Sequence, residues 1–314
     1  MYKKEYPFLR EVDSLALANV QLHLEKAYKN FFRDPKVGFP RFKSKHHSKN
    51  SYTTNVVNGN ILVEDNRIRL PKLKWISMKK HREPAENCRL KSVTVSMEPS
   101  GKYFASLLYE GYSCENQAAD RDYSNAKILG IDYAMQGMAV FSEEIEMEEA
   151  GFFRKNEKRL AREQRKLSRC VKGSRNYVRQ KKKVARCHEK IRNQRKDYLH
   201  KLSRRITDQY DIVAVEDIDM KAMGQCLHFG KSVQDNGYGM FRNMLDYKLS
   251  WKGKKLVKTD RFFPSSKKCS KCGKIKKELG LSERVYRCTC GNEMDRDRNA
   301  AINIREEARR MLAV

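Results

Sequence analysis

Two short apolar stretches that each end on an acid decide the predicted fold. Residues 128–133 read Ile-Leu-Gly-Ile-Asp-Tyr, and residues 212–217 read Ile-Val-Ala-Val-Glu-Asp. Continuous apolar runs of this length are typical of buried strands. A further apolar run follows at 138–141, after a short turn region around Gln136 and Gly137, which predicts a hairpin that opens a new domain.

Both acids follow a small residue on the same face of their strand. Because side chains alternate along a strand, Asp132 shares a face with Gly130, and Glu216 shares a face with Ala214. We expect the small residues to leave room for something bulky and hydrated. A hydrated metal ion is the predicted occupant.

A third acid comes from the segment 294–304, which has the pattern of a final helix. At about 100° per residue, Asp297 falls on the same face as Ala300 and Ala301, whereas Asp295 is turned by about 200° from Asp297. Small residues permit close packing of a helix on a sheet. We therefore predict that Asp297 faces the sheet and that Asp295 is the N-cap.

Three carboxylates on two strands and a helix predict a site for phosphodiester hydrolysis. This reaction needs an activated water and a stabilised leaving oxygen, and two Mg²⁺ ions about 3.5–4 Å apart supply both. Carboxylates are the hard oxygen ligands that Mg²⁺ prefers. The alternative is that each acid separately caps a strand or pairs with an arginine.

Four of the nine cysteines lie in two close pairs, Cys269 with Cys272 and Cys288 with Cys290, each followed directly by a glycine. Four thiolates in two pairs predict one tetrahedral structural Zn²⁺ site. The second pair has one intervening residue where two are standard. A redox pair or an incomplete site is the alternative.

The chain of 314 residues is strongly basic, with 67 Lys and Arg against 39 Asp and Glu and a formal charge of +28. Residues 154–205 alone hold 22 Lys and Arg against 4 acids, and their apolar residues recur at helical spacing on both sides of Lys172-Gly173-Ser174. This pattern predicts a hairpin of two long helices that binds phosphate rather than a merely solvated face. The predicted contacts are Arg154, Lys155, Lys158, Arg159, Arg162, Lys166, Lys172, Arg175, Lys181, Lys182, Lys183, Arg186, Arg195 and Lys201.

Nucleic acid is thus the predicted partner, in preference to a membrane, because no apolar run approaches the roughly 20 residues that a span needs. No signal segment follows Met1, which favours a cytoplasmic chain that is associated with the nucleoid when bound to DNA. Near the N-terminus, residues 13–33 predict a helix with Asp13 or Ser14 as N-cap. Short β runs between 51 and 112 predict a small antiparallel barrel or sheet.

Taken together, these motifs resemble the TnpB, or OrfB zinc-ribbon, proteins of insertion sequences, which are similar to compact type V CRISPR effectors. The resemblance covers the chain from about residue 6 to its end. The matching stretches are Gly130-Ile131-Asp132-Tyr133, Arg154 through Leu202, Val215-Glu216-Asp217, Asp260 through Lys267, the four cysteines, and Asp295 through Ile304.

The resemblance implies an α/β plus all-β chain, in which an RNase H-like (RuvC) domain carries an inserted zinc ribbon and a long helical hairpin. A small antiparallel wedge barrel and a helical remnant precede that domain. The implied domains are a recognition-lobe remnant (1–50), a wedge-like barrel (51–125), a RuvC-like nuclease (126–268, hairpin 154–206), the zinc ribbon (269–291) and the last RuvC segment (292–314).

The implied function is RNA-guided DNA cleavage, in which base pairing reads the target sequence. Asp132, Glu216 and Asp297 would be the catalytic ligands of two Mg²⁺ or Mn²⁺ ions, and the cysteines would bind one Zn²⁺. The partners would be a guide RNA from the end of the element and target double-stranded DNA. Compared with the family, the chain is expected to be truncated at its N-terminus, so the alternatives are a cleavage-deficient, RNA-guided DNA-binding regulator and a transposition accessory protein.

Overall fold

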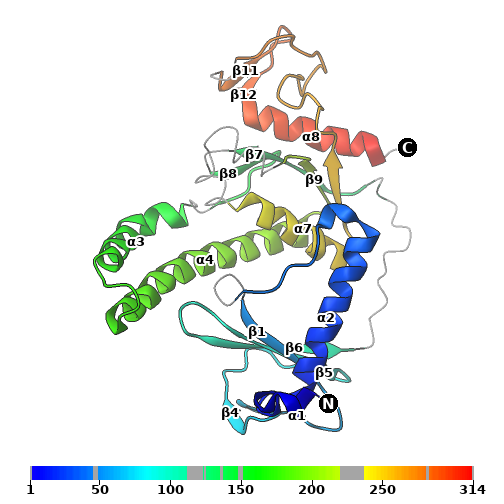
Figure 1. Ribbon diagram of the computed structural model, residues 1–314. Coiled ribbons are helices and arrows are strands. Elements are labelled where there is room, and N and C mark those ends of the chain that lie inside the picture. Colours follow the sequence, from blue (N-terminus) through cyan, green and yellow to red (C-terminus); the bar gives the residue numbers. More distant parts are fainter. Residues whose placement is uncertain are drawn as a thin grey trace. The chain divides into compact units, whose positions relative to one another are not determined.

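The computed structural model of the chain consists of two compact units, Met1–Cys114 and Glu115–Val314 (Figure 1). The residues whose structure is described are 2–44, 49–111, 123, 125–134, 137–147, 151–219, 237–280 and 283–312. In this part of the chain, none of the helices is both long enough and apolar enough to cross a membrane.

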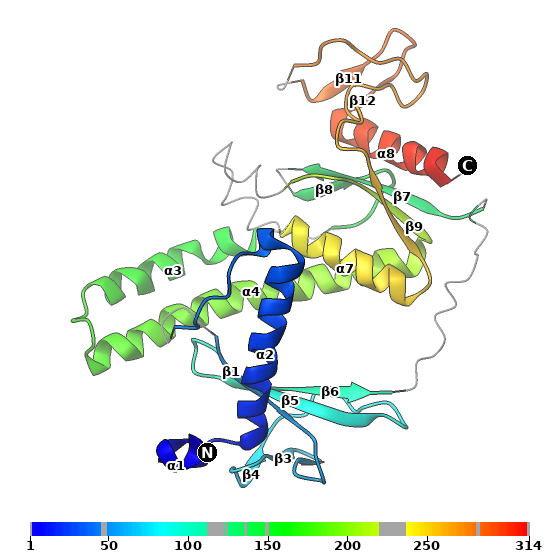
Figure 2. The same cartoon turned by 45° about the vertical axis from the view of Figure 1, so that its right-hand side comes forward.

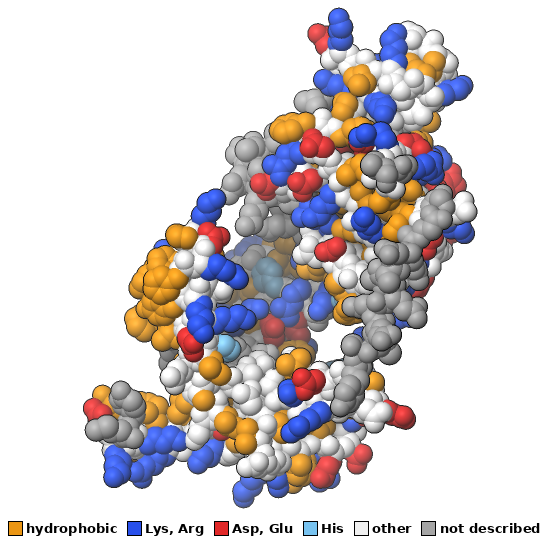
Figure 3. Space-filling model, turned by 90° about the vertical axis from the view of Figure 1, so that its right-hand side faces the viewer, with side chains coloured by type: hydrophobic (Ala, Val, Ile, Leu, Met, Phe, Trp, Pro, Cys, Tyr) orange, Lys and Arg blue, Asp and Glu red, His pale blue; other side chains and the backbone are white. Residues whose placement is uncertain are grey.

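The first unit begins with one long helix flanked by short turns. Its helical elements are α1 (Tyr2–Glu5), a 3-10 turn (Pro7–Arg10), α2 (Ser14–Arg33) and a second 3-10 turn (Pro35–Val37). Asp13 caps α2, because its carboxylate accepts a hydrogen bond from the backbone N–H of Leu15 at 3.1 Å. Of the two predicted N-caps, Asp13 and Ser14, the first is therefore confirmed. Large apolar side chains of α2 such as Val20 and Phe32 stay exposed, and Figure 3 shows hydrophobic side chains at the surface among Lys and Arg.

The strands of the first unit form two small antiparallel sheets. They are β1 (Asn50–Asn55), β2 (Leu62–Glu64), β3 (Arg67–Arg69), β4 (Trp75–Ser77), β5 (Arg89–Met97) and β6 (Tyr103–Glu110). The sheet orders are β1-β5-β6 and β2-β3-β4, and both sheets contribute to a core around Ile68 and Val93. The antiparallel strands are therefore confirmed, but within residues 49–111 no strand pairing joins the two sheets into the predicted closed barrel.

The second unit is built on a four-stranded sheet of order β10-β9-β7-β8. Its strands and helices are β7 (Ile128–Ala134), β8 (Met138–Phe141), α3 (Phe152–Ser168), α4 (Arg175–Gln209), β9 (Ile212–Glu216), α7 (Tyr238–Trp251), β10 (Lys255–Thr259), β11 (Val285–Arg287), β12 (Glu293–Asp295) and α8 (Arg296–Leu312). β7 and β8 form the predicted antiparallel hairpin, whereas β9 runs parallel to both β7 and β10.

Helices cover both faces of this sheet, as Figure 2 shows, with α8 on one side and α4 with α7 on the other. The α4 and α7 side holds the larger core, which includes Leu199, Ile206, Phe241 and Leu245 among its fully buried side chains. On the other face, α8 packs Ile304 and Ala308 against the inner strands. With both faces covered, the inner strands β7 and β9 are apolar up to Asp132 and Glu216, as the sequence predicted.

α3 and α4 form the predicted helical hairpin. The chain reverses at Gly173, whose φ of 84° favours glycine, and the Ser174 hydroxyl caps α4 by accepting a hydrogen bond from the N–H of Tyr177 at 3.1 Å. Leu160 of α3 packs with Cys187 and Ile191 of α4 in a small core of their own. At the turn end of the hairpin, α3 and α4 are thus held by this small core and by the Gln180 side chain, which donates to the Glu163 carboxylate at 2.7 Å.

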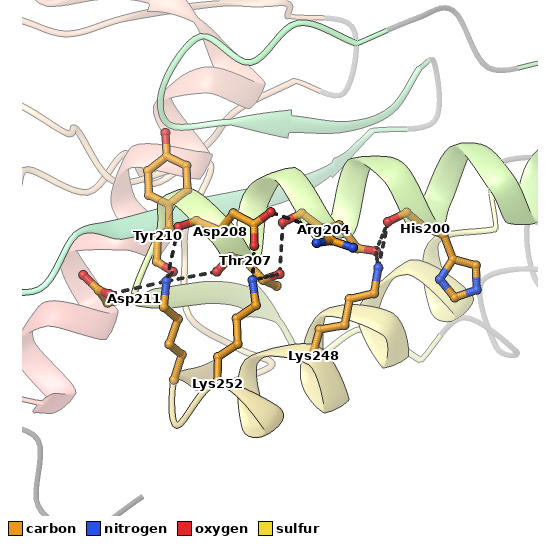
Figure 4. Close-up of polar contacts among 10 residues, drawn as sticks. His200, Arg204, Thr207, Asp208, Tyr210, Asp211, Lys248 and Lys252 are labelled. Carbon is orange, nitrogen blue, oxygen red and sulfur yellow. Dashed lines mark hydrogen bonds and ion pairs between the residues drawn. The ribbon is translucent and has the colours of Figure 1, made fainter. Parts of the chain in front are cut away.

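Three lysines at the end of α7 attach it to the end of α4 (Figure 4). Lys248 Nζ donates hydrogen bonds to the His200 carbonyl and to the Ser203 hydroxyl, both at 2.7 Å, and Lys252 pairs with the carboxylate of Asp208. Lys254 Nζ donates to two carbonyls at the end of α4, those of Thr207 at 2.9 Å and Tyr210 at 2.8 Å. Carbonyls in the last turn of a helix lack partners within it, so Lys254 acts as a C-terminal cap, and Lys248 and Lys252 attach α7 to the preceding turns of α4.

Candidate active site and metal centre

Asp132 and Glu216 are brought side by side by the pairing of two parallel strands. Ile128 is opposite Ile212 and Ile131 is opposite Val215, so the same register places Asp132 next to Glu216 at the carboxyl ends of β7 and β9. Neighbouring strands lie about 4.8 Å apart. The two predicted carboxylates therefore project from adjacent positions on one face of the sheet.

Asp297 lies in the first turn of α8, on the side of the helix that packs on the sheet. Ala300 and Ala301 on that side are 1% and 0% exposed. The Asp295 carboxylate instead accepts a hydrogen bond from the backbone N–H of Arg298 at 2.9 Å, which makes Asp295 the N-cap of α8. The predicted cap at Asp295 is therefore confirmed, and the role of Asp297 as a metal ligand stays a prediction.

The three acids act on each other electrostatically. Burial raises the pKa of Asp132 well above its usual range, and the charges of Glu216 and Asp297 raise this pKa further. Burial also raises the pKa of Glu216. Two neighbouring carboxylates whose pKa values are raised in this way would be stabilised in their charged form by a bound cation, so the donor set fits a hard metal ion.

Asp217 follows Glu216 directly but has a different environment. Its carboxylate lies 3.4 Å from Nη2 of Arg261 and 3.9 Å from Nη1 of Arg242. Arg261 also donates from Nε to the Asp217 carbonyl at 3.3 Å. Two guanidinium groups thus already compensate the charge of Asp217, which distinguishes it from Glu216.

The prediction that Gly130 and Ala214 leave room for a hydrated metal ion is wrong. A Cβ atom at Gly130 would lie 2.0 Å from the carbonyl oxygen of Ala301 and 2.8 Å from the backbone N of Arg305. Ala214 likewise packs in the core beneath Ile304. The space beside these residues is therefore filled by the backbone and side chains of α8, and what it permits is close approach of the helix that carries Asp297.

Two residues at this site were not singled out from the sequence. The Ser265 hydroxyl donates a hydrogen bond to Glu216 Oε1, which lowers the pKa of Glu216 against the effect of burial. Tyr238 is 1% exposed, and its hydroxyl has no hydrogen-bond partner in the described part of the chain. Burial and then the charges of Asp132 and Glu216 raise the pKa of Tyr238. Ser265 lies in the stretch 260–267 that carried the resemblance, whereas no local pattern marks Tyr238.

The four cysteines converge on one point. Cys269 Sγ lies 3.7 Å from Cys290 Sγ, and Cys272 Sγ lies 3.7 Å from Cys288 Sγ. Four sulfurs around a tetrahedral Zn²⁺ with bonds of about 2.3 Å would be about 3.8 Å apart. Among the described His, Cys, Asp and Glu residues, this is the group whose ligand atoms all lie within 4.8 Å of one another. The cluster is compatible with a structural metal site.

Backbone hydrogen bonds shape both cysteine turns. The N–H of Gly273 donates to the carbonyl of Cys269 at 2.9 Å, and the N–H of Gly291 donates to the carbonyl of Cys288 at 3.0 Å. Both glycines have positive φ, 76° and 83°, as the tight turns require. Burial alone would raise the pKa of Cys269, but hydrogen bonds from the backbone and from Asn292 lower it to about 6, which favours the metal-binding thiolate.

The basic residues predicted to contact phosphate lie on α3, on α4 and in the turn between them. All of them except Arg195 are exposed. Lys166 and Lys201 also form ion pairs within their own helices, with Glu163 at 3.3 Å and Asp197 at 2.8 Å. The hairpin thus presents many cations to solvent with few acids to neutralise them.

Comparison with known proteins gives two family matches and several relatives. Residues 111–226 match the family described as "Probable transposase" (OrfB_IS605), and residues 238–304 match the "Cas12f1-like, TNB domain" family. The fold is similar to that of a Cas12f1 chain in a complex with sgRNA and target DNA, with a TM-score of 0.52 and 16% identity over 88% of this chain and 67% of that one.

Two of the relatives are similar along almost the whole chain. A "Putative RNA-guided DNA endonuclease" of Streptomyces pristinaespiralis is 35% identical, and the match covers 96% of this chain and 73% of the relative. "Putative RNA-guided DNA endonuclease InsQ" of Escherichia coli K12 is 32% identical, with 98% and 78% covered. A "TnpB-like protein L79" of Acanthamoeba polyphaga mimivirus is 28% identical over 37% of this chain. The chain therefore belongs to the TnpB-type family of RNA-guided DNA endonucleases.

Proposed function

We propose that the chain cuts DNA under the guidance of an RNA, by Mg²⁺-dependent phosphodiester hydrolysis at Asp132, Glu216 and Asp297. The observation that carries this proposal is the convergence of these acids at one edge of the sheet, where the charges of Glu216 and Asp297 raise the pKa of Asp132. The relatives are named as putative RNA-guided DNA endonucleases, which supports DNA cleavage as the reaction. The three acids are the site at which it would occur.

The three carboxylates would share the binding of two Mg²⁺ ions. When bound, such ions supply an activated water and stabilise the leaving oxygen. Asp217 would hold the end of β9 through its arginine partners and would not be a ligand.

The domain assignment is part of the same proposal. Residues 126–268 and 292–314 would form the RuvC-like domain, supported by the joint packing of β7, β9, β10 and α8. Residues 269–291 would form the inserted zinc ribbon. Residues 1–50 would belong to a recognition lobe and residues 51–125 to a wedge.

The decisive experiment is to sequence the RNA that copurifies with the protein and then to offer a duplex that matches it. Cleavage of the matched duplex in Mg²⁺, with no cleavage of a scrambled duplex, would support the proposal. Binding of the matched duplex without cleavage would leave a regulator, and absence of any discrete RNA would refute RNA guidance.

Zinc content tests the assignment of the cysteines. We expect one equivalent of zinc in the purified protein. Cys269→Ser and Cys288→Ser each remove one of the four sulfur ligands and should lose the zinc. In small peptides, structural zinc contributes on the order of 10–16 kcal/mol to folding. The sheet of the second unit should stay folded in both variants. Cys170→Ser, a change at the hairpin turn, is the matched control and should keep its zinc. Less than about half an equivalent in the unmodified chain would contradict the assignment.

Salt dependence tests the helical hairpin as the RNA-binding surface. Reversing the charges of Lys181, Lys182 and Lys183 to Glu should flatten the slope of log affinity against log salt by roughly 0.7 to 0.9 per lost phosphate contact. The control reverses three exposed lysines of the first unit, Lys72, Lys74 and Lys79, and so changes the net charge equally. Equal effects in both variants would mean that only total charge matters.

A further inference from the structure

Two buried amide side chains of α8 hold the loop that precedes the first cysteine. Asn303 is 3% exposed, and its Nδ2 donates to the carbonyls of Ser265 at 2.7 Å and Lys268 at 2.6 Å. Asn299, one turn earlier and 0% exposed, donates to the Lys268 carbonyl at 2.7 Å and accepts from the N–H of Ser270 at 3.0 Å. The loop 265–270 is therefore fixed to α8 by four hydrogen bonds.

This loop connects the two candidate metal sites. At one end, the hydroxyl of Ser265, which is 6% exposed, donates to Glu216 Oε1. At the other end, Cys269 belongs to the cysteine cluster, and its thiol also accepts from Asn292 Nδ2 at 3.5 Å. Only three residues separate Ser265 from Cys269, so a shift of the cysteine is transmitted to the serine unless the loop deforms.

We propose that Ser265 is a positioning residue for Glu216, and that Asn299 and Asn303 make its position depend on the metal in the cysteine cluster. The inference rests on the proposed function, in which Glu216 is a nuclease metal ligand. A hydroxyl that holds one carboxylate oxygen leaves the other oxygen in a fixed direction. Partners of this kind orient metal ligands and contribute to metal affinity.

A purely structural role of the loop makes a different prediction. The two asparagines satisfy buried carbonyls, and their loss would destabilise the chain whether or not the loop acts on Glu216. A structural role would lower the melting temperature without changing the affinity of the folded protein for the nuclease metal. Metal affinity is therefore the quantity that separates the two readings.

The first test measures Mn²⁺ binding to the full chain by electron paramagnetic resonance, together with zinc content and melting temperature. Ser265→Ala should weaken Mn²⁺ binding about 10-fold or more, the range found when a partner of a metal ligand is removed. Ser265→Thr keeps the hydroxyl and should restore binding. Ser266→Ala is the matched control. It removes a hydroxyl from the next residue, and within the described part of the chain the Ser266 hydroxyl makes no hydrogen bond to Glu216. Unchanged Mn²⁺ binding in Ser265→Ala would overturn the proposal.

A double-mutant cycle tests the connection to the cysteines. Cys272→Ser should remove zinc and weaken Mn²⁺ binding, and it should have little further effect in the Ser265→Ala background, because both changes act on one contact. Effects that multiply independently would overturn the coupling. If Cys272→Ser fails to fold, Asn303→Ala replaces it, since Asn303 contacts Ser265 directly and is not a zinc ligand.

Asp132→Ala separates failure of this inference from failure of the proposed function. Loss of Mn²⁺ binding in Asp132→Ala, with normal binding in Ser265→Ala, would reject only the positioning role. Normal Mn²⁺ binding in Asp132→Ala would reject the nuclease site itself.

Discussion

Asp132→Ala, Glu216→Ala and Asp297→Ala should each abolish cleavage of a guided duplex while leaving its binding nearly intact. Each substitution removes one proposed metal ligand, whereas the cations of α3 and α4 are unchanged. Loss of an outer partner of a ligand already costs 10–100-fold, so loss of the ligand itself should lower the cleavage rate by more than about 100-fold. Cleavage time courses in Mg²⁺ and gel-shift affinities of the same preparations measure the two quantities.

Asp295→Ala is the matched control for Asp297→Ala, since both change an aspartate at the start of α8. Asp295 caps the helix through the N–H of Arg298, so its loss should cost about 0.5–2 kcal/mol of stability and little activity at low temperature. An inactive Asp295→Ala protein beside an active Asp297→Ala protein would reverse the assignment of the two acids.

Gly130→Ala should be among the most destabilising single changes in the second unit. The added Cβ would lie 2.0 Å from the carbonyl oxygen of Ala301, which belongs to the helix backbone and cannot rotate away. Overpacking of a core usually costs 1–3 kcal/mol, and displacement of a whole helix should cost about 3 kcal/mol or more. Urea denaturation followed by far-UV circular dichroism gives the free energy of unfolding.

Gly239→Ala makes the same change where there is space, because among the described residues no atom other than those of the adjoining α7 backbone and chain neighbours lies within 4 Å of the added Cβ. This position is in the first turn of α7, so alanine should be neutral or slightly stabilising. A Gly130→Ala protein as stable as the Gly239→Ala protein would show that α8 does not pack as closely on β7 as described.

Local chemistry made several features predictable. The caps Asp13 and Asp295 follow from side chains that accept hydrogen bonds from nearby backbone N–H groups, a signal that acts within one turn of the chain. The cysteine cluster follows from the close spacing within each of the two cysteine pairs.

Features that depend on tertiary packing were missed or misread. Gly130 was read as space for a hydrated ion, because the sequence does not show that α8 would fill it. The contact of Ser265 with Glu216 joins residues 49 apart along the chain. In the first unit, β1 is mostly polar and exposed, and the pairing that would distinguish a barrel from two sheets is also nonlocal.

The lysine contacts fix α4 at one end, and the rest of the helix extends away from them. Its 35 residues extend about 52 Å at 1.5 Å per residue, with the hairpin turn at the free end and three lysines at the other. A force on the hairpin turn would act on the lysine contacts over the whole length of the helix. β9 begins only three residues after the last residue of α4. These contacts and the buried packing of Leu199 and Ile206 hold the end of α4 beside the strand that ends on Glu216, so together they would limit how much bending at the hairpin reaches that strand.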